Sequence, residues 1–153
     1  MQFSPGDPLP DFDRPDHTGA AVTSADLAGS KAVIYFYPKA FTPGCTAESC
    51  DFRDNYTSFQ DAGYKVYGVS PDPVEELDAF RAEHDLPFPL LSDVDHSMAE
   101  AFGAWGTKKN YGREYEGIIR STFAVGEDGI IEHAWYNVRA EGHVARVGSD
   151  VLG

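Results

Sequence analysis

The sequence of 153 residues is poor in cysteine, in basic residues and in long apolar runs. No stretch approaches the roughly 18 apolar residues of a membrane-spanning helix, and the N-terminus lacks the basic and apolar segments of a signal peptide. We therefore expect a cytoplasmic protein with no membrane partner. Because 12 basic residues stand against 25 acidic ones, the net charge is −13, which would repel nucleic acid as a partner.

Only two cysteines are present, Cys45 and Cys50, and both lie in the segment YFYPKAFTPGCTAESC. Two thiols do not form the disulfide framework of a small secreted protein. In a reducing compartment such a pair is typical of catalytic, redox-sensing or metal-binding sites. The five histidines are scattered along the chain without ligand spacing beside the cysteines, so we expect no metal centre.

The hydrophobic pattern predicts strands and helices in alternation. Residues 32–37 are apolar on both faces, as in a strand buried at the centre of a sheet. Asp128 and Gly129 are typical of a tight turn between antiparallel strands. The expected elements are a hairpin within 11–23, strands at 32–37, 65–70, 88–93, 119–125 and 130–138, helices at 43–60, 72–85, 96–105 and 142–152, and a polar loop at 106–117.

Two of these helices carry specific expectations. Asp72 is expected as the N-cap of the helix at 72–85, with Pro73 at its first helical position. In the helix at 96–105, the apolar spacing predicts four inward-facing side chains, those of Met98, Ala101, Phe102 and Trp105.

The order of elements predicts the fold class. Strands alternate with helices and end in a hairpin, which is typical of an α/β protein with a mixed sheet covered by helices on both faces. We expect one domain over residues 1–153 with a thioredoxin-like sandwich and an N-terminal β-hairpin. Another three-layer α/β topology is also compatible with the periodicity.

The residues before Cys45 predict the start of a helix. Thr42 is expected as the N-cap, Pro43 takes the first helical position and Cys45 the third. A thiolate at the third position would be stabilised by unpaired backbone N–H groups and by the positive end of the helix dipole. This placement favours a chemical role for Cys45, whereas Cys50 taken alone is more typical of a small buried hydrophobe.

The helix terminus is not enough to ionise the thiol. Lowering a cysteine pKa from about 8.5 to about 6 takes roughly 3.4 kcal/mol, and a helix terminus supplies at most about 2 kcal/mol. A cation must therefore contribute. Arg120 lies in an apolar strand context and is the candidate, and a strand-end arginine that reaches solvent is the equally weighted alternative.

Helical geometry separates the two cysteines. At 100° per residue, Cys45 lies on the same face as the expected core positions, whereas Cys50 points outward. Their Cα atoms would be about 8.7 Å apart in an intact helix, and a disulfide needs about 4.4 to 6.8 Å. The two thiols can therefore bond only if the first turns of the helix unwind.

At these residues the sequence resembles the peroxiredoxins, and specifically the peroxiredoxin Q group, also called bacterioferritin comigratory protein. The family motif Pro-x-x-x-Thr-x-x-Cys is present as Pro38, Thr42 and Cys45, and Cys50 occupies the group's resolving position. The resemblance covers nearly the whole chain, including the segments GDPLPDFDRPDHTG, LLSDVDHSMAEAFGAWG and YGREYEGIIRSTFAVGEDGIIEHAW.

The resemblance implies a thioredoxin-like fold and the reduction of hydrogen peroxide and organic hydroperoxides in antioxidant defence. By it, Cys45 is the peroxidatic thiolate and Arg120 its activating cation, while Thr42 hydrogen-bonds peroxide and sulfur and Pro38 shields the pocket. Cys50 would condense with the Cys45 sulfenic acid to form a disulfide. Thioredoxin or a similar dithiol would restore both thiols. No metal, haem or flavin cofactor is implied, and we expect a monomer or weak dimer.

Two other functions compete with this hypothesis. A thiol–disulfide oxidoreductase could share the fold, but its two cysteines usually stand two residues apart. A non-enzymatic redox sensor or holdase would use disulfide formation to expose a binding surface.

Overall fold

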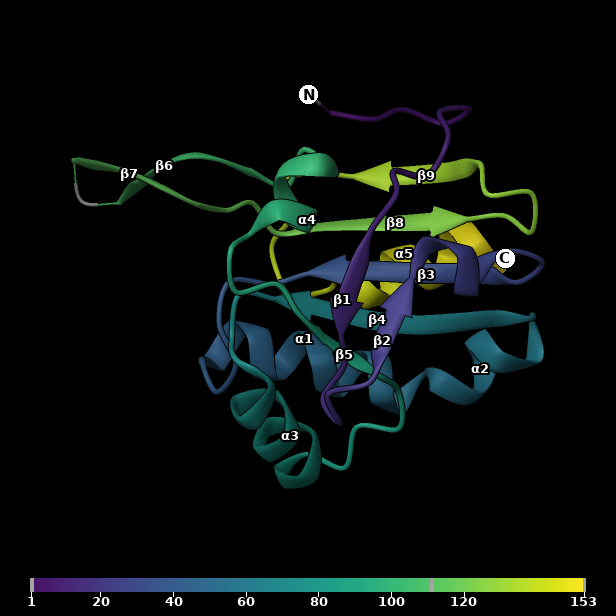
Figure 1. Ribbon diagram of the computed structural model, residues 1–153, viewed down its shortest axis with the longest axis horizontal. Helices are drawn as coiled ribbons and strands as arrows, with labels where there is room; N and C mark the ends of the chain where they lie inside the picture. The colour runs from purple at the N-terminus through teal and green to yellow at the C-terminus, as the bar shows by residue number, and fades with distance from the viewer. Residues whose placement is uncertain (1, 111, 153) are drawn as a thin grey trace.

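In the computed structural model, which describes residues 2–110 and 112–152, the protein is built around a mixed sheet of five strands (Figure 1). The strand order across this sheet is β5-β4-β3-β8-β9. β3 is parallel to β4 and antiparallel to β8, so it occupies the centre as the sequence predicts. The bounds are β3 Lys31–Phe36, β4 Tyr64–Ser70, β5 Leu90–Ser92, β8 Ser121–Val125 and β9 Ile131–Trp135.

The two faces of β3 contribute to two hydrophobic clusters, because side chains alternate along a strand. Val33, Tyr35 and Tyr37 pack with the buried residues of four helices on one face. Ala32, Ile34 and Phe36 pack on the other face against the N-terminal segments and a short helix. The first face is covered by α1 Pro43–Asp54, α2 Tyr56–Asp61, α3 Val74–Glu83 and α5 His143–Leu152, the second by 3₁₀ helix η1 Ser24–Leu27 and α4 Ser97–Ala101. The predicted sandwich is therefore confirmed.

The N-terminal hairpin is also confirmed. Its strands, β1 Asp13–Pro15 and β2 Ala21–Thr23, are antiparallel, and Arg14 pairs with Val22. Gly19 lies in the turn between them with a φ of 89°, a conformation that glycine adopts without strain.

The single helix predicted over 43–60 is wrong, because the chain breaks at Asn55. Asn55 has φ −107° and ψ 6°, and its side-chain amide donates to the Asp51 carbonyl at 2.8 Å. This local bond satisfies a carbonyl at the end of α1 and competes with a further helical turn. The break leaves Cys45 and Cys50 together in α1 and places Phe59 in α2.

The predicted start of the next helix is also wrong, because the N-cap is Pro73 and not Asp72. Asp72 is buried, and its carboxylate accepts hydrogen bonds from the Ala40 N–H at 2.7 Å and the Ser70 hydroxyl at 2.7 Å. Tertiary contacts thus use the carboxylate that local sequence assigned to a cap.

The helix predicted over 96–105 ends at Ala101, where the chain turns through Gly103 at a φ of 74°. Met98 and Phe102 are buried as expected, but Ala101 is exposed. Trp105 does not belong to the helix and begins a strand.

The polar loop predicted over 106–117 is an antiparallel arm. Its strands are β6 Trp105–Asn110 and β7 Arg113–Ile118, and it projects from the body of the molecule (Figure 1). Tyr111 of the predicted loop lies outside the described residues. The arm lacks an alternating apolar pattern because much of it does not pack on the core, so periodicity gave no strand signal.

The remaining elements agree with the sequence predictions within a few residues at their ends. No helix in the described ranges has the length and apolar character that crossing a bilayer demands.

Candidate active site

The site begins where β3 ends. Tyr37 still donates its N–H to the carbonyl of Val69 at 3.0 Å, after which the chain leaves the sheet. The hydrogen bond from the Ala40 N–H to the buried Asp72 carboxylate holds the loop that follows. Phe41 has a φ of 65°, and its ring contacts Phe80 at a centroid distance of 5.2 Å. This loop delivers the chain to the start of α1.

Cys45 is the third residue of α1, as the sequence predicts, and only 1% of its surface is exposed. Thr42 holds the N-cap position with extended backbone angles, but its side chain makes no capping bond. The Thr42 hydroxyl donates to the Lys39 carbonyl at 2.7 Å instead. The backbone N–H groups of the first helical turn therefore stay available to a thiolate or a bound oxygen.

Arg120 reaches Cys45 from a distant part of the chain. It lies one residue before β8, and its Nη2 is 3.4 Å from the Cys45 sulfur. The Arg120 side chain is only 16% exposed, so the alternative of a solvent-reaching arginine is wrong. A Cβ at Gly44 would lie 3.4 Å from Nη2, so the guanidinium lies close beside the backbone of the first turn.

Glu48 completes this contact, and the sequence reasoning missed it. Its side chain is fully buried, and Oε1 accepts a hydrogen bond from Arg120 Nη1 at 2.5 Å. Because Glu48 follows Cys45 by three residues, both project from the same face of α1. That spacing was the available signal. The two ends of one guanidinium fork thus contact the carboxylate and the sulfur.

The charged groups in this cluster shift one another's pKa values. Burial alone would lower the pKa of Arg120, but the Glu48 carboxylate and the Cys45 sulfur raise it above its usual value. Burial raises the pKa of Glu48 to about 7, although Arg120 opposes the rise. The cluster therefore keeps its cation firmly charged and makes its carboxylate the group that takes up a proton near neutral pH.

His143, at the start of α5, lies behind Glu48. Its Nε2 is 2.7 Å from the Thr122 hydroxyl and 4.0 Å from Glu48 Oε2, which has no hydrogen-bond partner among the described residues. Burial, together with the positive charges of Arg120 and Arg146, lowers the pKa of His143 to about 4. His143 is therefore a neutral, buried member of the cluster.

Cys50 lies in the same unbroken helix as Cys45 but off its buried face. It is half-buried, both thiols are free, and burial raises the pKa of Cys50 despite the nearby Arg53. A protonated, partly exposed thiol is a poor nucleophile until its surroundings change. The structure therefore separates the two thiols as the helical geometry predicts.

A pocket of about 520 Å³ opens beside the cluster. Pro38 and Arg120 line it together with residues of the β6–β7 arm and of the segment after β9, namely Thr107, Lys108, Lys109, Ile119, Asn137 and Val138, and Gln2. The volume lies within the usual range for small-molecule sites, roughly 300–1,000 Å³. Of the predicted site residues, Pro38 and Arg120 line this opening. Cys45 contacts Arg120 without lining the pocket itself, and Thr42 lies at the start of the helix that carries Cys45.

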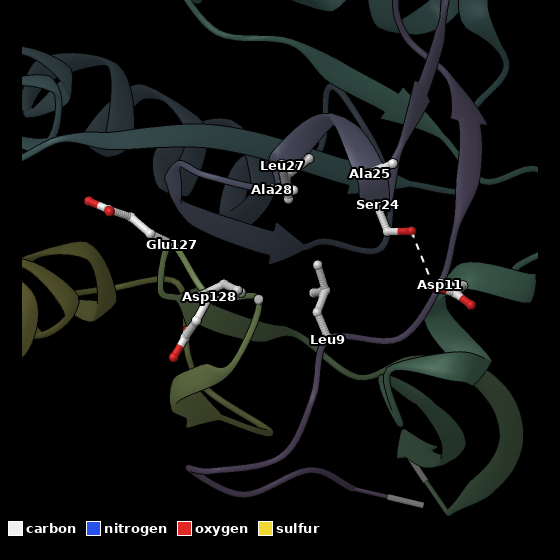
Figure 2. A pocket seen from close by; sticks show the side chains of 10 residues that line it. Leu9, Asp11, Ser24, Ala25, Leu27, Ala28, Glu127 and Asp128 are labelled. Atoms are coloured by element: carbon white, nitrogen blue, oxygen red, sulfur yellow. Dashed lines mark hydrogen bonds between the residues drawn. The ribbon is translucent and has the colours of Figure 1, made fainter.

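A second pocket, of about 280 Å³, lies at the opposite end of β3 and β8. Leu9 points into it between η1 and the turn at 127–129, and Ser24 donates to Asp11 at 3.5 Å (Figure 2). Arg120, which contacts the Cys45 sulfur, lines the first pocket and not this one. The chemistry therefore belongs to the first pocket.

The chain is similar to known proteins over nearly its whole length. Residues 5–134 match the AhpC/TSA family. A protein of Mycobacterium tuberculosis is 51% identical over 150 residues, which cover 98% of this chain and 96% of that one. Peroxiredoxin Bcp of Bacillus subtilis is 45% identical over 145 residues, 95% of this chain and 92% of its own.

Solved structures of proteins from the same group have a similar fold. A structure of Xanthomonas campestris peroxiredoxin Q has a TM-score of 0.86 at 39% identity. A structure of the bacterioferritin comigratory protein from that organism, which concerns its alkyl peroxide reduction activity, also has a TM-score of 0.86, at 38% identity. Both cover 92% of this chain and 89% of theirs.

Proposed function

The chain belongs to the AhpC/TSA family and, within it, to the peroxiredoxin Q group of thiol peroxidases, and we propose that Cys45 is the residue that attacks the hydroperoxide. The observation that carries this assignment is the guanidinium of Arg120, whose Nη2 is 3.4 Å from the buried sulfur while Nη1 contacts Glu48. Hydrogen peroxide and organic hydroperoxides are the proposed substrates, and antioxidant defence is the proposed role.

In the first step the Cys45 thiolate attacks the terminal oxygen of the hydroperoxide. A sulfur–oxygen bond forms, the O–O bond breaks, and the leaving oxygen takes a proton to become water or an alcohol. Sulfur is oxidised by two electrons to sulfenic acid as the peroxide is reduced. Arg120 and the free N–H groups of the first turn of α1 stabilise the negative charge that moves from sulfur to oxygen. Thr42 would hydrogen-bond the peroxide, and Pro38 would shield the pocket.

In the second step Cys50 attacks the Cys45 sulfenic acid, a disulfide forms, and water leaves. This step needs the first turns of α1 to unwind, because an intact helix keeps the two Cα atoms about 8.7 Å apart and a disulfide needs less than about 7 Å. An external dithiol, for which thioredoxin is the proposed source, then reduces the disulfide and restores both thiols.

Rapid-mixing measurements of peroxide consumption with a thioredoxin system test these assignments. We expect Cys45→Ser to abolish the reaction. Cys50→Ser should complete one fast turnover, accumulate oxidised Cys45 and then recycle poorly, because the resolving thiol is missing. Steady turnover at the wild-type rate in Cys50→Ser would remove Cys50 from its role. Equally slow consumption by wild type and Cys45→Ser would favour a redox sensor or holdase over a peroxidase that acts through Cys45.

A further inference from the structure

The pocket beside Cys45 contains a second cation, Lys108, that the proposed reaction does not use. Lys108 lies on β6 of the projecting arm, directly opposite Tyr115 on β7. It is half-buried, unlike the exposed Lys109 that follows it. A half-buried ammonium in a substrate pocket is stabilised when it binds an anion.

The backbone of the arm turns Lys108 toward the site. Because side chains alternate along a strand, Gly106 and Lys108 share one face of β6. A Cβ at Gly106 would lie 3.0 Å from the side chain of Ile119, which immediately precedes Arg120. A Cβ at Gly117, opposite Gly106, would lie 3.2 Å from Lys108 Cδ. The paired glycines therefore let the arm approach the body and leave space for the lysine stem.

The charge of Lys108 has no acidic partner within the described ranges of the chain. Lys109 pairs with Glu114 at 3.7 Å and Arg120 pairs with Glu48, but no ion pair includes Lys108. Burial and the charge of Arg120 lower the pKa of Lys108, and the Cys45 sulfur is the anion that opposes this effect. The Lys108 ammonium lies over the ring of Tyr115, 6.0 Å from its centroid. An anion bound in the pocket would give it the ionic partner that the described residues do not provide.

The charge of the residues that line the pocket is opposite in sign to the net charge of the molecule. The chain carries 25 acidic residues and a net charge of −13. None of the described residues that line the pocket is acidic, whereas three are basic. The neighbouring pocket, which shares Asn137 and Val138, adds Arg139 and Arg146 against one carboxylate, Glu141. A strongly acidic protein thus presents a locally cationic entrance to its reactive thiol.

From these observations we propose that Lys108 binds an anionic group of the substrate, so that the site prefers hydroperoxides that carry their own carboxylate. This inference rests on the proposed function. A carboxylate approaching an anionic sulfur on an acidic protein would otherwise be repelled, and Lys108 offsets that repulsion at short range. The reaction balance does not change: the thiolate and the O–O bond react as above, and the carboxylate is neither oxidised nor reduced.

A matched substrate pair isolates the charge. We would measure the second-order rate constant of Cys45 oxidation with para-carboxycumene hydroperoxide and with its neutral methyl ester. Wild type should react faster with the acid than with the ester. Lys108→Gln should lower the acid-to-ester ratio by roughly fivefold, the size expected for one partly screened charge pair, and Lys108→Glu should lower it further. Added salt should also reduce the wild-type ratio, because ions screen the attraction.

Lys65→Gln is the control, because Lys65 is exposed on β4 and changes the net charge equally without lining the pocket. Its ratio should equal that of wild type. An equal ratio in wild type and Lys108→Gln, or the same loss in Lys65→Gln, would overturn the inference alone. A wild type that oxidises Cys45 with neither compound would overturn the proposed function and this inference with it.

Discussion

At the scale of single residues, the site depends on one guanidinium that has two jobs. Arg120 contacts the Cys45 sulfur with one nitrogen and the Glu48 carboxylate with the other. A planar fork can make both contacts in fixed directions, whereas a lysine ammonium is a point charge on a flexible stem. Glu48 therefore orients the cation, and the positive charge of Arg120 in turn offsets part of the desolvation penalty of the buried carboxylate.

Arg120→Lys tests whether geometry matters beyond charge. We expect the first step of peroxide reduction to slow by about a hundredfold, the typical cost of removing one preorganised donor. The thiolate absorbance of the variant at neutral pH should also be smaller. Arg14→Lys, on β1 and paired with Asp95, is the control and should behave as wild type. A first step of unchanged rate in Arg120→Lys would show that a nearby positive charge is sufficient.

His143 makes stability depend on pH. Its pKa falls from 6.5 in the unfolded chain to about 4 in the fold, so only the unfolded chain takes up a proton in that window. The stability that His143 contributes is therefore fully present above about pH 6.5 and is lost as the pH falls toward about 4. Glu48, whose pKa rises from 4.5 to about 7 in the fold, acts in the opposite direction. The stability that Glu48 contributes is fully present below about pH 4.5 and is lost as the pH rises through about 7.

His143→Gln should isolate the histidine term. Relative to wild type, we expect the variant to gain about 2 kcal/mol of unfolding free energy when the pH falls from about 7 to about 5. Chemical denaturation at the two pH values measures this change. His133→Gln, on β9, serves as the matched control. A wild-type-like pH profile for His143→Gln would contradict the assignment of His143 as the buried neutral imidazole.

At the scale of elements, α1 must be stable enough to present Cys45 and weak enough to release it. The N-cap side chain of α1 makes no capping bond, and the helix ends at the Asn55 break. A missing cap bond typically costs about 1 kcal/mol. The first turn therefore lacks one stabilising contact, which lowers the free energy that a covalent bond between Cys45 and Cys50 must overcome to unwind it.

Oxidation should unwind this part of α1. We expect residues 45–50 to lose amide-exchange protection in the disulfide form, because the intact helix holds the two Cα atoms about 8.7 Å apart. Hydrogen exchange on the reduced and oxidised proteins measures the change, and Cys50→Ser treated with peroxide is the control without a disulfide. Equal protection of 45–50 in reduced and disulfide forms would be incompatible with this mechanism.

At the scale of the whole molecule, the sheet brings together groups that are far apart in the sequence. Arg120 and Cys45 are 75 residues apart, and they meet because β3 and β8 are antiparallel neighbours. The C-terminal end of β3 therefore lies beside the start of β8. The β6–β7 arm, which precedes β8, then lies beside the same opening and supplies Lys108. The topology thus gathers the thiol, its cation and the entrance lysine at one end of the sheet.

The sequence by itself determined the features that local chemistry controls. Apolar side chains on both faces of 32–37 require a buried strand, and Thr-Pro-Gly-Cys sets a helix start with Cys45 at its third position. The same helical geometry separates Cys45 from Cys50. These results follow from periodicity and backbone preferences over a few residues, so no distant contact is needed to predict them.

Only the tertiary structure decided the rest. His143 and Lys108 have no local signature beyond ordinary polar residues, and Glu48 has only its three-residue spacing from Cys45. Their roles arise when α1, α5 and β6 converge around Arg120. Asp72 was misassigned because a cap and a loop anchor use the same carboxylate, and only the fold decides which N–H it meets. Burial turns these side chains from solvated groups into partners, because a buried charge must find a counter-charge or a hydrogen bond, and burial is a property of the whole chain.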